Sequence, residues 1–207
     1  MPKPIVTLTT DFGLSDHFVG VMKGVILSIC PRAQIVDISH AVTPFAIAEG
    51  AYLIAQAYRY FPKGTVHLVV VDPGVGTARR AILVEAAGQS FVAPDNGVLS
   101  MIYSREKHTV RALTNDRYFL KPVSQTFHGR DIFSPVAAHR AAGIGAARLG
   151  KRIADYVQPG FEKPQRTGAR AWTGRILHVD RFGNVITNFP VNEFRDLASR
   201  KFSMALG

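Results

Sequence analysis

The pattern of apolar and polar positions along residues 1–150 predicts strands and helices in turn. Short apolar runs, which suit strands, alternate with longer stretches in which apolar residues recur every three or four positions, as on one face of a helix. The expected strands are 5–10, 34–39, 67–71, 81–86 and 90–94, and the expected helices are 15–30, 45–61 and a stretch that starts near Ser134. This alternation favours an α/β fold, with an amino-terminal sandwich domain built on a mainly parallel sheet.

The two ends of the helix expected at 15–30 carry further information. Ser15 stands in the position of an N-cap residue, and the lone cysteine, Cys30, closes the helix. A single cysteine cannot form an internal disulfide, so we expect Cys30 to be a buried small apolar residue in a reducing compartment. The amino terminus lacks the apolar stretch of a secretory signal, and no run approaches the ~20 apolar residues that span a bilayer. A cytoplasmic protein without membrane contact is therefore expected.

The composition changes at residues 159–169, where proline, glycine and charge replace the apolar periodicity. This predicts a linker between an α/β domain at 1–158 and a second domain at 170–207. The second domain begins with two β-like runs around the turn-forming letters FGN, which is the pattern of a hairpin. Only 38 residues remain from Arg170 onward, too few for an independent β-domain, so we expect the truncated start of a larger β structure.

The formal net charge of +10 raises the question of nucleic-acid binding. Most of the positive surplus lies after His139, where basic residues are scattered without the interleaved aromatic residues of a base-stacking platform. We interpret this charge as a solvated basic surface. A basic binding protein that recognises nucleic acid remains the less favoured alternative.

A polar residue stands directly after each of four expected strands. These residues are Asp11, His40, Asp72 and Asp95, the last followed by Asn96. The carboxyl ends of parallel strands meet at one edge of a sheet, and ligands bind at that edge, so we expect these side chains to converge. Each alone would be read as a turn or cap residue, whereas the set predicts a ligand site.

The letters DPGVGT, which follow the strand at 67–71, resemble a phosphate-binding loop only superficially. They lack the GK[ST] ending of a P-loop and the third glycine of a dinucleotide fingerprint. Their glycines instead allow a tight turn at the strand end. We expect Arg79 to face Asp72 across this turn as its counter-charge, and Arg80 to be solvated.

The letters TFHGRDIF place His128 between an aromatic residue and a glycine, just before the helix expected near Ser134. The other histidines are interpreted as structural, apart from His40 at a strand end. The acidic residues and histidines are acceptable ligand types for a divalent cation, but none of their spacings is a metal signature. No metal site is therefore predicted, and a metal-dependent hydrolase of another nucleoside remains an alternative.

Six stretches of the chain resemble the S-adenosylmethionine (SAM) hydroxide adenosyltransferases, also called SAM hydrolases, which are related to the SAM-dependent fluorinase and chlorinase. They occur in family order and cover nearly the whole chain: TTDFGLSDHFVGVMKG, ISHAVTPF, VVVDPGVGTARRAI, FVAPDNGVLS, TFHGRDIFSPVAAH and VDRFGNVITN. The resemblance implies an amino-terminal α/β domain and a carboxyl-terminal β-barrel that continues, in the family, beyond Gly207. It also implies a homotrimer whose active sites lie between one subunit's first domain and its neighbour's second.

The resemblance further implies hydrolysis of SAM to adenosine and L-methionine without a cofactor. Asp72, Arg79 and His128 would hold a water or hydroxide that attacks C5′ of the ribose. The halogenating relatives carry a tyrosine where this chain has Asp72 and a threonine where it has Val75. The chain therefore resembles a hydrolase, while a halogenase that forms a 5′-halo-adenosine, and SAM binding without turnover, remain alternatives.

Other substrate contacts are carried over from the family by position. In the first domain, the resemblance assigns Asp11 to the ribose hydroxyls, and Phe45 and Phe127 to the walls around the reacting centre. In the second, it assigns Asp180 to the methionine ammonium, and Phe182 and Asn184 to adenine. Asn96 is expected to be structural.

Overall fold

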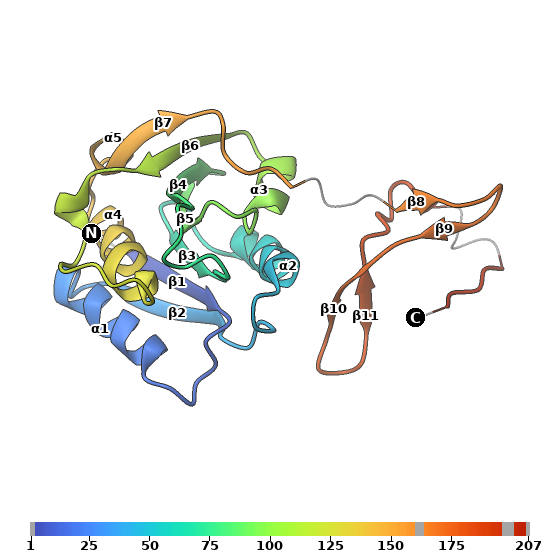
Figure 1. Cartoon of the computed structure of the whole chain (residues 1–207), viewed down its shortest axis with the longest axis horizontal. Helices are drawn as coiled ribbons and strands as arrows, with labels where there is room; N and C mark the ends of the chain where they lie inside the picture. Colours follow the sequence, from blue (N-terminus) through green and yellow to red (C-terminus); the bar gives the residue numbers. More distant parts are fainter. Residues whose placement is uncertain (1–2, 160–163, 196–200, 206–207) are drawn as a thin grey trace. The chain divides into compact units, whose positions relative to one another are not determined.

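The computed structural model describes residues 3–159, 164–195 and 201–205. The chain forms two compact units, Met1–Pro159 and Gly160–Gly207. The expected linker at 159–169 lies partly outside the described residues, and a short strand, β8 (Gln165–Arg166), occupies part of the rest. The elements of both units are drawn in Figure 1.

The first unit is built on a seven-stranded sheet in the order β2-β1-β3-β5-β4-β6-β7. The strands are β1 (Ile5–Thr10), β2 (Gln34–Ser39), β3 (Val66–Val70), β4 (Ala81–Ala86), β5 (Gln89–Pro94), β6 (His108–Leu113) and β7 (Gly150–Ile153). The pairs β1–β2, β1–β3 and β3–β5 are parallel, whereas β4, β6 and β7 add antiparallel pairs beyond β5. The α/β fold is confirmed, and its parallel part holds the strands with polar residues at their carboxyl ends.

Helices cover both faces of this sheet (Figure 1). They are α1 (Phe18–Ile29), α2 (Ile47–Ala57), α3 (Ser100–Arg105), α4 (Ser134–Ala141) and α5 (Ala146–Leu149), with 3-10 turns η1 (Tyr58–Tyr60) and η2 (Asp116–Tyr118) and a π-helical turn η3 (Gly129–Phe133). Alternate residues of β3 point to opposite faces. Val66, Leu68 and Val70 pack in one core with residues of α1 and α4. β3 is buried on both faces, which explains why its sequence is almost entirely apolar.

The structure corrects the expected start of the first helix. α1 begins at Phe18 with His17 at the N-cap, and no side chain caps it, so Ser15 is not the N-cap. The reason is that the chain continues as a loop after β1, where the N–H of Gly13 donates to the carbonyl of His40. Cys30 is buried at the helix C-cap, as predicted.

β3 carries one fully buried histidine, His67. Its Nδ1 lies 2.7 Å from the Thr7 hydroxyl, its Nε2 lies 3.3 Å from Oε1 of Gln89, and its ring stacks on Phe91. Burial lowers the pKa of His67 to about 4, so the ring is neutral at pH 7. The structural interpretation of this histidine agrees with these contacts.

Acidification is expected to destabilise the first unit through His67. An unfolded histidine titrates near 6.5, so between that pH and about pH 4 the unfolded chain binds a proton that the folded chain does not. The stability of the first unit is therefore full well above pH 6.5 and decreases as the pH falls, by about 2–3 kcal/mol at pH 4.5. Urea unfolding at pH 7.5 and 4.5 should show a smaller loss in His67→Leu than in wild type. His17→Gln, which replaces an exposed histidine, should keep the wild-type loss; an equal loss in His67→Leu would contradict the assignment.

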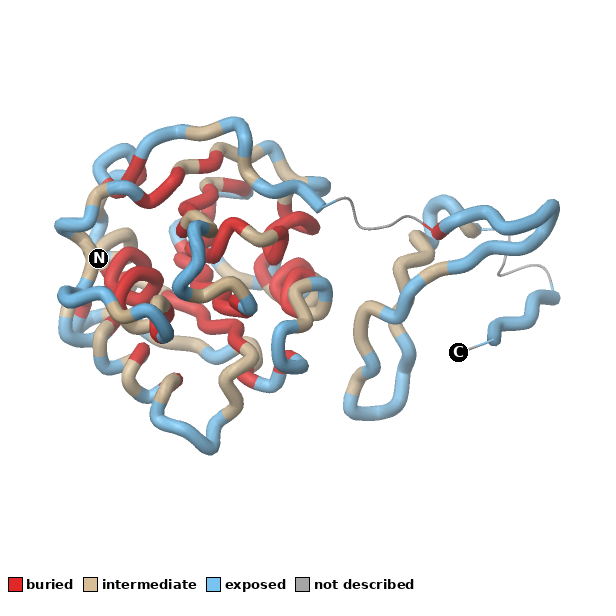
Figure 2. Tube along the Cα trace, viewed as in Figure 1, coloured by how far each residue is buried: buried red, intermediate tan, exposed pale blue. Residues whose placement is uncertain are grey.

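The described part of the second unit consists of two antiparallel pairs. β8 pairs with β9 (Trp172–Thr173), and β10 (Ile176–Val179) pairs with β11 (Val185–Thr187), which forms the hairpin predicted around FGN. Most of these residues are exposed or half-buried, in contrast to the first unit (Figure 2). Among the described residues of the chain, no helix combines the length and apolar character needed to cross a bilayer.

Candidate active site

The carboxyl ends of β2, β1, β3 and β5 are neighbours, because these strands are parallel and adjacent in the sheet. The four polar residues predicted to converge therefore do follow adjacent strand ends. Their side chains, however, have different partners. Asp72 joins a cluster with Arg79 and His128, and Asp11 lies near this cluster, whereas His40 and Asp95 bind other partners.

Asp72, Arg79 and His128 are in direct contact. Nε of Arg79 donates to Oδ1 of Asp72 at 2.9 Å, and Nη2 donates both to Oδ2 of Asp72 and to Nδ1 of His128, the latter at 2.7 Å. The side chains of Asp72 and Arg79 are only 5% and 10% exposed. The predicted pairing of Arg79 with Asp72 is confirmed, in the two-bond geometry that favours an arginine over a lysine.

His128 is fixed as an acceptor at Nδ1. Since Nδ1 accepts an N–H of Arg79, the neutral ring carries its proton on Nε2. Burial lowers the pKa of His128 and the positive charge of Arg79 lowers it further, against opposing effects of Asp72, the Ser124 backbone and Asp131. At neutral pH, His128 therefore presents a neutral ring whose Nε2–H donates to the Ser124 backbone.

Gly76 allows the loop after β3 to pack against the loop that carries His128. Its φ is +78°, and a Cβ added there would lie 2.3 Å from the carbonyl oxygen of Gln125. The loop is also tightly turned, with the N–H of Val75 donating to the carbonyl of Asp72 and the Thr77 hydroxyl donating to that of Gly74. A glycine at this position therefore brings Asp72 and Arg79 within reach of His128.

The replacement Gly76→Ala is expected to destabilise the first unit by about 2–4 kcal/mol, because it combines a strained φ with a steric clash. Gly13→Ala is the matched control. Gly13 has a φ of +66°, but nothing lies within 4 Å of an added Cβ, so only the backbone strain of about 1 kcal/mol applies. Urea unfolding measures the free energy of unfolding of both variants. Equal losses would show that the contact with Gln125 is not required.

Asp11 holds Phe45 in an unusual backbone conformation. Its Oδ2 accepts the N–H of Phe45 at 2.9 Å, and Phe45 has a φ of +67° while its side chain is 67% exposed. A positive φ at a bulky residue is strained and persists only where neighbouring contacts enforce it. Burial raises the pKa of Asp11 and the charge of Asp72 raises it further, while the Phe45 N–H opposes the shift. Asp11 and Asp72 follow the adjacent parallel strands β1 and β3, which is close enough for their charges to interact.

Aromatic rings surround Phe127, the residue before His128. Its ring centroid lies 5.0 Å from that of Phe18 and 6.1 Å from that of Phe12, both in edge-to-face orientation. Phe127 itself is buried, and Arg130 lies over its ring. These contacts fix the backbone from which His128 extends.

Two other residues at strand ends have structural partners. His40 is buried, with Nδ1 2.9 Å from the Thr10 hydroxyl and Nε2 3.1 Å from Oδ1 of Asp37. Asn96 donates to the carbonyl of Val71 and accepts the N–H of Val98, so the expectation that it is structural agrees with its contacts.

The expectation that Arg80 is solvated was wrong. Its guanidinium forms ion pairs with Asp95 at 2.8 Å and with Asp155 at 2.9 Å, and it also donates to the carbonyl of Asp155. Asp95 in turn accepts the N–H of Val157. The physical reason is that burial of Asp95, whose side chain is 2% exposed, requires a cation and hydrogen-bond donors.

The three candidate residues of the second unit share the turn between β10 and β11. Oδ1 of Asp180 accepts the N–H groups of Phe182 and Asn184, and Oδ2 accepts Nδ2 of Asn184. These bonds, led by that of the Asn184 side chain, lower the pKa of Asp180. Gly183 has a φ of +85°, and the ring of Phe182 is 89% exposed. The turn thus presents an ionised carboxylate and an aromatic ring together.

Comparison with known proteins identifies the family. Residues 6–150 match the SAM hydroxide adenosyltransferase N-terminal domain. The chain belongs to this family. It is 44% identical over 188 residues to an (R)-S-adenosyl-L-methionine hydrolase of Salinispora tropica, a match that covers 89% of this chain and 71% of that protein. A fluorinase of Actinoplanes sp. is 30% identical, over 89% of this chain and 71% of the fluorinase.

A solved structure supports the family's fold for this chain. The crystal structure of an uncharacterized conserved protein from Thermotoga maritima has a TM-score of 0.83 and 44% sequence identity, covering 94% of this chain and 74% of that one. The resemblance drawn from the six sequence stretches is therefore confirmed at the level of family and fold.

Sequence reasoning missed several residues that shape the site of this family member. Gly76 and Phe12 lie inside quoted motifs, but no local pattern shows which loops or rings they contact. Phe18 lies within the helix expected at 15–30, but the helical pattern does not show that its ring contacts Phe127. Asp131 lies within the letters TFHGRDIF, but its contact with Ser124 depends on the π-helical turn.

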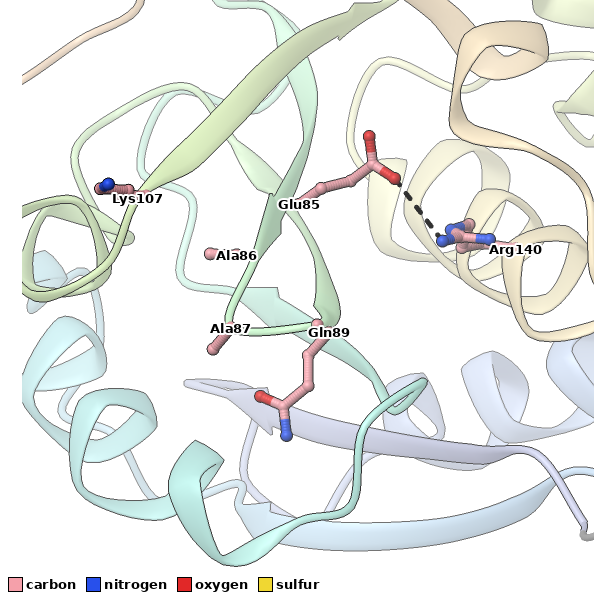
Figure 3. A pocket seen from close by; sticks show the side chains of 7 residues that line it. Glu85, Ala86, Ala87, Gln89, Lys107 and Arg140 are labelled. Carbon is pink, nitrogen blue, oxygen red and sulfur yellow. Dashed lines mark ion pairs between the residues drawn. The ribbon is translucent and has the colours of Figure 1, made fainter.

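A separate pocket lies at the opposite end of the sheet, at the turn between β4 and β5 (Figure 3). It has a volume of about 300 Å³ and is lined by Glu85, Ala86, Ala87, Gly88, Gln89, Lys107 and Arg140. Glu85 points towards Arg140, 3.6 Å away. None of the candidate site residues lines it. Within 3–159, 164–195 and 201–205, no three His, Cys, Asp or Glu side chains are grouped to hold a metal ion.

Proposed function

We propose that this chain hydrolyses S-adenosyl-L-methionine to adenosine and L-methionine. The observation that carries the proposal is the partly buried cluster of Asp72, Arg79 and His128 beside the end of the parallel strand β3, in a member of the SAM hydroxide adenosyltransferase family. The relative named (R)-S-adenosyl-L-methionine hydrolase, at 44% identity, is closer than the fluorinase at 30%.

The reaction places its main demand on the nucleophile. The oxygen of water forms a bond to C5′ of the ribose while the C5′–S bond breaks, and the bonding pair leaves with sulfur. The leaving group is a neutral thioether, so no general acid is needed, and water loses one proton. The site must therefore align water opposite sulfur and stabilise its hydroxide character.

The cluster has the groups that this step requires. Arg79 supplies a permanent positive charge, which in a buried site favours a developing hydroxide. Each carboxylate oxygen of Asp72 accepts from Arg79 and keeps a lone pair for the water. His128 holds the guanidinium of Arg79 in place beside the water by accepting an N–H at Nδ1. Proton acceptance by His128 would require exchange of its bond with Arg79.

Substrate binding is assigned to residues near the cluster and in the second unit. The single carboxylate of Asp11 accepts hydrogen bonds from both vicinal ribose hydroxyls. Phe45 and Phe127 form walls around the sulfonium. In the second unit, Asp180 binds the methionine ammonium, and Phe182 and Asn184 bind adenine. The lowered pKa of Asp180 and the exposed ring of Phe182 support these roles.

The cluster also argues against halogenation. A halide ion at the position of the attacking water would lie beside the carboxylate of Asp72, whose like charge disfavours it. A hydroxide shares that repulsion, but water approaches as a neutral molecule and donates a hydrogen bond to the carboxylate. The alternative, a 5′-halo-adenosine product, is therefore disfavoured by a specific residue.

We also propose a cytoplasmic homotrimer that uses no cofactor or metal, with a carboxyl-terminal β-barrel completing each site at a subunit interface. The buried lone Cys30 fits a reducing compartment, and the family resemblance supports the assembly. Light scattering on purified protein should give three times the chain mass. A monomer at micromolar concentration would contradict the trimer.

Incubation of purified protein with SAM, followed by chromatography, tests the function. Adenosine and methionine should appear in equal amounts, unchanged by chelator and without halonucleoside when chloride or fluoride is added. Formation of a halonucleoside would show that the chain is a halogenase. Loss of turnover on addition of chelator would show that it is a metal-dependent hydrolase. No adenosine together with salt-dependent retention on DNA would favour the basic binding protein.

A further inference from the structure

A buried carboxylate beside the cluster has no role in the reaction described above. Asp131, in η3, is fully buried. Its Oδ2 accepts the N–H of Ser124 at 2.8 Å, and Arg130 donates to both of its oxygens, at 2.5 Å from Nε and 3.0 Å from Nη2. Its own carbonyl accepts the N–H of Leu120 at 2.8 Å. Asp131 therefore ties the loop before His128 to the helical turn after it.

Ser124 connects Asp131 to the loop that carries His128. Its hydroxyl accepts the N–H of Phe127 at 2.9 Å and also bonds the Asp131 carboxylate. Its backbone carbonyl accepts the Nε2–H of His128. The contacts thus run in series from Asp131 through Ser124 to His128, then to Arg79 and Asp72. A buried carboxylate is costly unless donors satisfy it, and these donors all belong to the segment around His128.

We propose that Asp131 is a positioning residue for the hydrolysis, which through Ser124 holds the ring of His128 where Nδ1 accepts from Arg79. The inference rests on the proposed function, because its kinetic readout is adenosine release. π-helical turns such as η3 often occur where a side chain must be aimed at a functional site. The consequence is that activity depends on a carboxylate that does not touch the substrate.

The charges around His128 give the inference a distinctive signature. Four groups act on it: Arg79 lowers the pKa of His128, whereas Asp72, the Ser124 backbone and Asp131 raise it. Removing the charge of Asp131 should lower this pKa further. Since only the unprotonated Nδ1 accepts from Arg79, activity falls as the pH drops through the pKa of His128. The acid limb of the rate profile should therefore move to lower pH in Asp131→Asn.

Kinetics of Asp131→Asn test this role. We expect kcat to fall on the order of tenfold to a hundredfold, as for a small displacement of a reacting group, with little change in KM for SAM. The acid limb of kcat/KM should lie at lower pH than in wild type. Asp116→Asn is the matched control, because Asp116 is an exposed carboxylate in η2 that pairs with Lys121, and both readouts should be unchanged.

NMR titration of the His128 ring separates this inference from the proposed function because it needs no substrate. The His128 signal is assigned as the one that is missing from the spectrum of His128→Gln. The pKa of His128 should be lower in Asp131→Asn than in wild type. An unmoved titration or an unchanged kcat in the folded variant overturns the inference, whereas wild type that releases no adenosine overturns the function. If Asp131→Asn fails to fold, Ser124→Ala decides. A lowered kcat in that variant supports the inference, and an unchanged kcat overturns it.

Discussion

Asp72→Asn is expected to lower kcat for SAM hydrolysis by about 10²–10⁴-fold while leaving KM nearly unchanged. The amide has one oxygen where the carboxylate has two, so it cannot accept both N–H groups that Arg79 directs at it. The charge that orients the attacking water is also lost. Steady-state assays of adenosine release at several SAM concentrations measure kcat and KM separately.

Asp155→Asn is the matched control for this experiment. Asp155 is also paired with an arginine, Arg80, but it is 79% exposed and lies outside the cluster. Its loss should leave kcat within about twofold of wild type, because exposed ion pairs contribute little. A pure rise in KM in Asp72→Asn, with kcat unchanged, would show that Asp72 binds substrate and does not act on the nucleophile.

Arg79→Met is expected to have the largest combined effect. It leaves Asp72 buried without a counter-charge and His128 without its donor. Breaking a buried pair in this way destabilises a protein by about 3–5 kcal/mol, and loss of the cation should remove measurable turnover. Arg79→Lys should recover part of the stability but not the turnover, since an ammonium cannot reproduce the two-bond geometry.

Urea unfolding of single and double variants tests the cause of this loss. Asp72→Asn combined with Arg79→Met removes the unpaired charge, so the double variant should be more stable than Arg79→Met alone. Arg59→Met, which removes an arginine whose side chain is 58% exposed, should change stability by less than about 1 kcal/mol. Arg79→Met with wild-type stability would contradict the importance of the buried pair.

The parallel half of the sheet and its polar edge could be predicted because the signals are local. Apolar runs of strand length end at Asp11 and Asp72, and Arg79 lies only seven residues beyond Asp72 across a glycine turn. The antiparallel strands β6 and β7 were not predicted. Half-buried or exposed basic residues such as Arg111, Lys151 and Arg152 interrupt their apolar pattern.

Contacts between segments far apart in the sequence could not be predicted. Arg80 was interpreted as solvated, but its partner Asp155 lies 75 residues further along the chain. Asp131 is followed by the apolar residues Ile132 and Phe133, which suit an ordinary helix start, and its contacts depend on a turn with π-helical geometry. The sequence thus indicated the candidate catalytic residues, whereas their supporting contacts required the fold.

The neighbouring arginines at 79 and 80 have a consequence for the length of the loop that precedes them. Arg79 reaches Asp72, and Arg80 reaches Asp95, so consecutive side chains serve different partners. Inserting one residue between Asp72 and Arg79 would bring Arg79 to the position of Arg80 and Ala78 to the position of Arg79. Deleting one residue would bring Arg80 to the position of Arg79 and Ala81 to the position of Arg80. In either case one of the two carboxylates would face an alanine and lose its guanidinium. The spacing of this segment, and not only its composition, is therefore under physical constraint, and variation in its length would be tolerated less well than a change of side chain at Val75.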